Sequence, residues 1–323
     1  AHLSAAPARR ARRRPPMRVG VVVPMTGNSA SATFLRDFAV RAEELGFDSL
    51  WTWERLLQPL NPQTAYGGSS STYRPTRTIP EQQRNAMAPT EVMAGLAAWT
   101  RRARIGSGII VMGLTNPVSL AKRLATVDIL SGGRLIAGLG LGWSEDEYMA
   151  AGVEYRTRGR RSEEFIEVLT KCWAGDPVAH SGHFFQVPPS VIAPKPLQRP
   201  RPPLVLGLWS KAGLERTARY GDGWMTGGGM TLDEAVAARD WMNSLRESRQ
   251  PALSVHYQLF VQLPVPRRAD LTVDELVSEV ARAATLGIDE VVVNPTFSRW
   301  SADADAWLGF LEAAVPALEA AHG

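Results

Sequence analysis

Glu54 and Arg55 are the residues whose types most readily suggest chemistry, because they lie side by side at the end of the strand-like segment Ser49–Arg55. A carboxyl group there can act as a general acid or base. A guanidinium can stabilise an anion but cannot readily carry protons, since it stays charged. We therefore assign both as candidate catalytic residues. A purely structural ion pair between the two side chains remains the alternative.

A glycine-rich run over residues 138–142 follows the apolar segment Arg134–Leu139 and forms a second candidate region. Its GxGxG spacing differs from the GxGxxG fingerprint of dinucleotide-binding folds, and the three carboxylates at 145–147 would repel a pyrophosphate. Ser144 and Glu147 match a helix capping box. The glycines therefore indicate close strand–helix packing or a backbone that lies flat against a planar ring, and these two interpretations are compatible.

The turn after the apolar segment Pro203–Leu208 is the better candidate for a phosphate site. Ser210 can cap the helix that follows, and the backbone N–H groups of Lys211, Ala212 and Gly213 would then face a bound anion. The positive end of the helix dipole would lie behind them. An ordinary capped helix explains the same residues equally well.

Strand-like and helix-like segments alternate along the chain and must position these residues. Eight such pairs in 323 residues predict a (β/α)₈ TIM barrel, with a doubly wound sheet as the alternative. Capping boxes at Thr231–Glu234 and Thr272–Glu275 support two helix starts, and Gly46 and Gly287 fit helix ends. The predicted strands are Arg18–Pro24, Asp48–Trp53, Arg104–Val111, Arg134–Leu139, Pro203–Leu208, Gly223–Thr226, Leu253–Leu263 and Asp289–Asn294. The predicted helices are Ala32–Leu45, Thr90–Thr100, Pro117–Leu130, Arg161–Trp173, Lys211–Tyr220, Leu232–Ser248, Val273–Leu286 and Ala302–Ala320.

Two long segments interrupt this alternation. Glu54–Pro89 follows the second strand, and it combines flexible glycines and serines with tyrosines and arginines that suit an anionic, planar ligand. We expect it to close over the catalytic face of the barrel. Gly175–Pro202 is rich in proline and forms an excursion before the fifth strand.

Composition limits the remaining possibilities. The formal charge of +4 becomes −1 without residues 1–16, which hold five arginines and no acid, so the body shows no nucleic-acid footprint. We expect 1–16 to be a disordered, dispensable basic tail, either an extension upstream of Met17 or an arm that meets a partner. The remainder, 17–323, is predicted to be a single domain. No apolar run reaches transmembrane length, and the lone Cys172 suits a buried position. His180 and His183 lack further ligands nearby, so no metal site is predicted.

Several segments, in the same order and spacing, resemble the luciferase-like flavin and deazaflavin oxidoreductases. They are RAEELGFDSLW (41–51), RIGSGIIV (104–111), NPVSLAKRLATVDILSGGRL (116–135), GLGLGW (138–143), FIEVLTKCWAGDPV (165–178), IAPKPLQRPRPP (192–203) and ARYGDGW (218–224). Within that family the segments are most similar to enzymes that use the deazaflavin coenzyme F-420. The resemblance implies a cytoplasmic, homodimeric oxidoreductase that acts on a small organic molecule, with no nucleic-acid or membrane partner.

The resemblance also implies roles for individual residues. The family often has a histidine where this chain has Arg55, and there the histidine supports negative charge on N1 of the reduced ring. A non-prolyl cis peptide is expected at Gly108–Ile109, backing that ring. Two alternatives stay open, namely an FMN-dependent monooxygenase that uses reduced flavin and oxygen, and a flavin-binding protein without turnover. The cofactor-binding residues implied are Gly108, Ile109, Val111, Leu141, Gly142, Asp146, Leu208, Trp209, Ser210 and Lys211.

Overall fold

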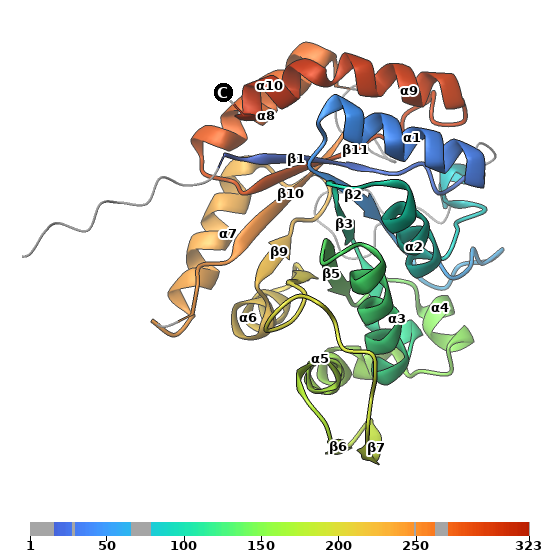
Figure 1. The fold of residues 1–323 in the computed structure, drawn as a ribbon, viewed down its shortest axis with the longest axis vertical. Helices are drawn as coiled ribbons and strands as arrows, with labels where there is room; N and C mark the ends of the chain where they lie inside the picture. The colour runs from blue at the N-terminus through green and yellow to red at the C-terminus, as the bar shows by residue number, and fades with distance from the viewer. Residues whose placement is uncertain (1–15, 28–29, 66–78, 249, 262–270, 323) are drawn as a thin grey trace, which may run out of the picture.

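Parallel strands close into a barrel that helices surround, as Figure 1 shows. The computed structural model describes residues 16–322 except 28–29, 66–78, 249 and 262–270. Of the predicted basic tail, residues 1–15 therefore lie outside the described part of the chain. The strand order is β3-β2-β1-β11-β10-β9-β8-β5-β4, and an additional pairing of β3 with β5 closes the sheet. The closure confirms the predicted (β/α)₈ barrel and excludes the doubly wound alternative.

The described elements follow the predicted alternation. The barrel strands are β1 (Arg18–Val22), β2 (Ser49–Thr52), β3 (Arg104–Ser107), β4 (Ile110–Val111), β5 (Leu135–Gly140), β8 (Leu204–Gly207), β9 (Gly223–Met225), β10 (Ser254–Phe260) and β11 (Glu290–Asn294). The outer helices are α1 (Ala32–Leu45), α2 (Pro89–Trp99), α3 (Pro117–Leu130), α5 (Arg158–Ala174), α6 (Lys211–Tyr220), α7 (Leu232–Ser244), α8 (Val273–Thr285), α9 (Ala304–Ala313) and α10 (Val315–His322). Shorter pieces are α4 (Glu145–Ala150), η1 (Glu81–Gln83), η2 (Met112–Leu114), η3 (Tyr155–Thr157), β6 (Val178–Ser181) and β7 (Gln186–Ser190).

Three predicted elements differ from the structure. The third strand, Arg104–Val111, is divided into β3 and β4, and the Gly108–Ile109 peptide between them is cis, as the resemblance implies. The last predicted helix, Ala302–Ala320, is two helices, because Pro316 lacks the N–H that would continue α9. The excursion Gly175–Pro202 contains the antiparallel β6–β7 hairpin, which projects from the barrel in Figure 1.

Local chemistry explains where several helices begin and end. The Thr231 and Thr272 side chains each accept a hydrogen bond from the backbone N–H of the glutamate three residues later. The carboxylate of that glutamate accepts the threonine backbone N–H, so both predicted capping boxes are confirmed. Gly46 ends α1 with a positive φ of 99°, the left-handed conformation in which glycine has no Cβ penalty.

The inner face of the barrel is filled by side chains and glycines rather than left open. Trp51 lies in an inner apolar cluster with Val22, Ile136, Val205, Met225 and Val292. Gly106 on β3 provides the space for its ring, because a Cβ at that position would lie 2.5 Å from the ring. The larger apolar core lies between the outer face of the strands and the helices, and the predicted burial of Cys172 on α5 is confirmed there. None of the helices within the described ranges is long and apolar enough to cross a membrane.

Candidate active site

The predicted site residues come together at one end of the barrel. All barrel pairings are parallel, so the segments that follow β2, β4, β5 and β8 meet at the carboxyl-terminal mouth. This is the face where barrel enzymes build their active sites. Of the predicted residues, Gly108 and Ile109 join β3 to β4 and Val111 ends β4. The others follow β2, β5 or β8, and they are Glu54, Arg55, Leu141, Gly142, Asp146, Leu208, Trp209, Ser210 and Lys211.

Glu54 joins the end of β2 to the end of β4. Its Oε2 accepts a hydrogen bond from the Val111 backbone N–H at 2.6 Å. Burial raises the pKa of Glu54 to about 7, the nearby Glu147 carboxylate adds to the rise, and the Val111 N–H opposes it. The mouth therefore holds a carboxyl group that can exchange a proton near neutral pH.

Arg55 forms its ion pair with Glu147 and not with Glu54, the partner that the sequence suggested. Its Nη1 lies 3.1 Å from Oε2 of Glu147, and both side chains are only 5% exposed. Its Nη2 donates to Gln83 Oε1 at 2.6 Å, and its guanidinium lies 4.7 Å from the centroid of the Trp143 ring. The structural ion pair at this strand end is thus Arg55–Glu147 rather than Arg55–Glu54.

Glu147, on α4, ties the loop after β2 to the mouth. Its Oε1 accepts the Leu56 N–H at 2.7 Å, while Ser144 Oγ accepts the Glu147 N–H at 3.4 Å. The predicted capping box is therefore only half formed, because the carboxylate serves the loop instead of the helix start. Asp146 continues this role, since its Oδ2 accepts the Gln63 N–H at 3.0 Å. The predicted lid is anchored to α4 up to this point, and its segment 66–78 lies outside the described residues.

The strand ends beside the cis peptide leave space for Ile109. A Cβ on Gly140 would lie 2.6 Å from Ile109 Cδ1, and one on Gly207 would lie 2.7 Å from its Cγ2. Gly142 has a positive φ of 63°, and a Cβ there would meet Val111 at 2.9 Å. The glycine-rich run therefore packs closely against the bulge, and no side chain from these glycines covers it.

The turn after β8 presents one exposed aromatic side chain. Trp209 is 52% exposed, although its Nε1 donates to the Met225 carbonyl at 3.1 Å. Leu208 is buried beside it. Ser210 caps α6 by accepting the Gly213 N–H at 3.2 Å, as predicted. The first backbone N–H groups of α6 lack intrahelical acceptors by helix geometry, so they can meet an anion.

The opposite end of the barrel interior holds a polar network that the sequence did not reveal. His256 Nδ1 lies 3.0 Å from Glu290 Oε2, and Ser254 Oγ lies 3.1 Å from His256 Nε2. Ser49 donates to Glu290, and Trp51 Nε1 donates to Ser49 Oγ at 2.7 Å.

Burial alone would raise the pKa of Glu290, but hydrogen bonds and charge from His256 and the Ser49 hydrogen bond lower it to about 2. The only sequence signals for this network were one histidine and one glutamate on separate strands. These residues lie at the amino-terminal end of the strands, where polar side chains serve barrel stability.

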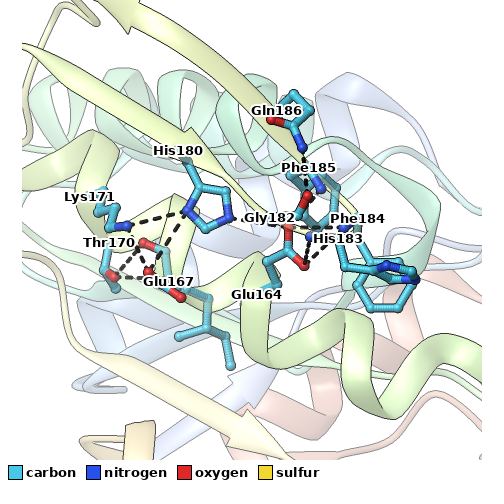
Figure 2. Close-up of polar contacts among 11 residues, drawn as sticks. Glu164, Glu167, Thr170, Lys171, His180, Gly182, His183, Phe184, Phe185 and Gln186 are labelled. Carbon is cyan, nitrogen blue, oxygen red and sulfur yellow. Dashed lines mark hydrogen bonds and ion pairs between the residues drawn. The ribbon is translucent and has the colours of Figure 1, made fainter.

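The β6–β7 hairpin uses its histidine in a structural hydrogen-bond network, shown in Figure 2. The Glu164 carboxylate accepts the backbone N–H groups of His183, Phe184 and Phe185, and its Oε1 lies 3.2 Å from His180 Nε2. Glu164 therefore holds the hairpin turn on α5. Within the described ranges, no group of three or more His, Cys, Asp or Glu side chains is arranged to hold a metal ion.

A closed parallel barrel with a titratable carboxyl group, a bulge and glycine-lined strand ends at its carboxyl-terminal mouth has the architecture of a TIM-barrel enzyme. A profile of the luciferase-like monooxygenase family matches residues 17–265, and the chain belongs to this family.

Relatives of assigned and unassigned function are similar to different shares of the chain. An uncharacterized protein of Mycobacterium tuberculosis is 27% identical over 254 residues, covering 78% of this chain and 83% of the relative. An FMNH2-dependent dimethylsulfone monooxygenase of Pseudomonas putida is 36% identical over 136 residues, covering 41% of this chain and 37% of that enzyme. The structure of an F-420-dependent secondary alcohol dehydrogenase with an F-420–acetone adduct has a TM-score of 0.69 at 15% identity, covering 94% of this chain and 99% of that one. This last likeness concerns the fold.

Proposed function

We propose that this chain transfers hydride between coenzyme F-420 and a small organic substrate at the carboxyl-terminal mouth of the barrel. The observation that carries the proposal is Glu54, whose pKa is about 7 and whose carboxylate contacts Val111, two residues after the Gly108–Ile109 bulge. Oxidation of an alcohol removes hydride from carbon and a proton from the hydroxyl, which leaves a ketone and the reduced cofactor. Such a reaction is best served by a base whose pKa lies near the working pH.

The side chains at the mouth fit a planar cofactor. The bulge carries the apolar Ile109. Its side chain occupies the space beside Gly140 and Gly207, where a Cβ on either glycine would clash with it. We assign Gly108, Ile109, Val111, Leu141 and Gly142 to the ring face. The Leu208–Lys211 turn is assigned to the anionic tail, with Asp146 acting through the loop that it holds.

When bound, F-420 supplies two-electron chemistry at C5 of the deazaflavin ring. Glu54 accepts the hydroxyl proton during oxidation and returns it during reduction. Arg55, the residue after Glu54, forms a buried ion pair with Glu147. That pair fixes the strand end that carries Glu54. The chain therefore supplies proton transfer and orientation.

Arg55 has a further role in this proposal, the stabilisation of negative charge near the ring. Its Nε is buried and donates no hydrogen bond within the described ranges, although Nη1 and Nη2 are held by Glu147 and Gln83. We expect Arg55→Ala to lower kcat about 10- to 1000-fold, with a smaller effect on cofactor affinity. Unchanged kcat with a large rise in cofactor Kd would show that Arg55 only binds.

An FMN-dependent monooxygenase is the second candidate, because the Pseudomonas putida relative at 36% identity is FMNH2-dependent. Calorimetric titration of the purified chain with F-420 and with FMN separates the two. Stopped-flow mixing of the F-420 complex with 2-propanol, followed by loss of deazaflavin absorbance, then tests hydride transfer. Binding of FMN alone, with oxygen uptake on reduction, would favour the monooxygenase. Tight binding without turnover over a broad panel of alcohols and ketones would favour a binding protein.

The assembly and organisation of the chain remain predictions. We propose a homodimer located in the cytoplasm, with residues 17–323 as one domain and 1–16 as a removable tail. Sedimentation velocity of the full chain tests the homodimer. A variant that starts at Met17 tests the tail, and we expect it to have the same melting temperature and activity as the full chain.

A further inference from the structure

Two tryptophans, Trp51 on β2 and Trp53 directly after it, differ in how their indole N–H groups are satisfied. Trp51 and Trp53 are two residues apart, so their side chains leave the same face of the strand. Trp51 Nε1 donates to Ser49 Oγ at 2.7 Å and lies 3.1 Å from Glu290 Oε1. Trp53 packs against the same inner cluster, one step nearer the mouth, directly before Glu54.

The Trp53 indole N–H is buried and has no acceptor among the described residues. Its backbone N–H is satisfied, because it donates to Met25 Sδ at 3.4 Å. Several other tryptophan N–H groups have partners, as in Trp173, which donates to the Ala121 carbonyl at 3.0 Å. The indole N–H groups of Trp209, Trp224 and Trp307 also donate to backbone carbonyls.

A buried donor without an acceptor is costly, and native proteins rarely keep one. The position of this donor explains why it is kept. It lies on the inner face of the barrel at the end where the cofactor and substrate would enter. Arg55, the neighbouring cation, directs Nη2 at Gln83 and Nη1 at Glu147, and only its Nε has no acceptor among the described residues. The unpaired indole is thus a neutral donor that is left for a ligand.

We propose that Trp53 Nε1–H donates a hydrogen bond to a carbonyl-type oxygen of the molecule bound in the mouth. The proposal rests on the proposed function, because the oxygen belongs either to the pyrimidine edge of the cofactor or to the substrate. A neutral donor suits an oxygen whose negative charge grows during hydride transfer, since it adds no full charge beside Glu54. Trp53 is a ligand-binding residue in this arrangement, and Trp51 is part of the internal network.

Trp53→Phe removes the indole donor together with part of the ring volume, and Trp173→Phe, which makes the same change of side chain, is the matched control. In the ligand-free protein, Trp173→Phe should lower Tm, because it removes the indole hydrogen bond to the Ala121 carbonyl as well as buried ring volume. Trp53→Phe should lower Tm less than this control does, because it loses ring volume but no hydrogen bond within the described residues. A fall in Tm equal to that of the control would show that Trp53 has an intrachain partner and would overturn the proposal.

Calorimetry then measures the Kd of each variant for F-420 and for FMN without substrate, and steady-state kinetics measures KM for 2-propanol. We expect Trp53→Phe to weaken one of these constants about 3- to 10-fold, the effect of one neutral hydrogen bond. A change in cofactor Kd identifies the cofactor as acceptor, and a change in KM alone identifies the substrate. Wild-type affinity and KM in Trp53→Phe would overturn the proposal. Failure of the wild type to bind either cofactor would instead refute the proposed function.

Discussion

At the amino-terminal end of the barrel interior, Glu290 accepts from Ser49 and lies beside His256 and Trp51, so its charge is compensated inside the protein. At the carboxyl-terminal mouth, Glu54 accepts one backbone N–H and the Trp53 indole has no acceptor among the described residues. The same residue types therefore have opposite electrostatic environments within one barrel. Compensated groups stabilise the fold, and uncompensated groups are available to a ligand.

The pKa values of the two glutamates express this difference. Hydrogen bonds and charge from His256 hold the pKa of Glu290 at about 2 against the effect of burial, whereas burial raises the pKa of Glu54 to about 7. Glu290 is thus ionised at neutral pH, and Glu54 is poised between its two forms. A carboxyl group poised in this way can carry protons during turnover, and one locked in its charged form cannot.

The largest expected effect is on turnover in Glu54→Gln. We expect kcat/KM for 2-propanol oxidation to fall about 10²- to 10⁴-fold, because the amide cannot accept the hydroxyl proton. In the wild type kcat/KM should rise with pH through about 7, as the carboxyl group ionises, and in the variant this inflection should be lost. Cofactor Kd is the control and should stay within about twofold. A variant with normal turnover and the same inflection would remove Glu54 from the mechanism.

Glu290→Gln should act on stability instead. Removing one member of a buried ionic network leaves the others uncompensated and costs about 3–5 kcal/mol of unfolding free energy. Urea unfolding followed by circular dichroism measures the loss. Cofactor affinity of the folded fraction should be unchanged, because the network lies at the other end of the barrel. A stable variant with weakened cofactor binding would contradict this division of roles.

The pH dependence of stability should have opposite signs at the two ends. Glu290 has a lowered pKa in the folded state, so its stabilisation is present above about pH 4.5 and is lost as pH falls toward 2. Glu54 has a raised pKa, so its contribution is present below about pH 4.5 and is lost as pH rises to 7. Each change amounts to roughly 3 kcal/mol. Urea titrations of the wild type and both glutamine variants between pH 2 and 8 measure how the unfolding free energy changes with pH. If Glu54 and Glu290 contributed pH dependences of the same sign, the assignment would be wrong.

The smallest expected effect concerns the turn after β8. Ser210→Ala removes the cap of α6 and should cost about 1 kcal/mol of unfolding free energy. Thr231→Ala removes an equivalent cap from α7 and serves as the matched control. If the α6 turn holds the cofactor tail, only Ser210→Ala should also raise cofactor Kd, by a few-fold. Equal Kd values in both variants would separate α6 from the cofactor site.

Sequence reasoning anticipated the parts of the site that depend on local order. The strand ends, the caps at Ser210, Thr231 and Thr272, and the bulge position at Gly108–Ile109 all lie where the pattern or the family resemblance indicated. Sequence reasoning did not identify Glu147 as the partner of Arg55, because these residues are 92 positions apart and Glu147 also fits a cap. The pairing needs the register of β2 against β5 across β3, which no local pattern contains.

By itself the sequence determined the alternation of strands and helices and the gathering of site segments at one mouth. These follow from burial periodicity and from the direction of parallel strands. Only the tertiary structure decided which polar groups compensate one another. Trp51 has an acceptor and Trp53 has none among the described residues, because Ser49 and Glu290 lie on the inner face at the depth of Trp51. That depth is set by barrel closure and stagger, a property of all the strands together.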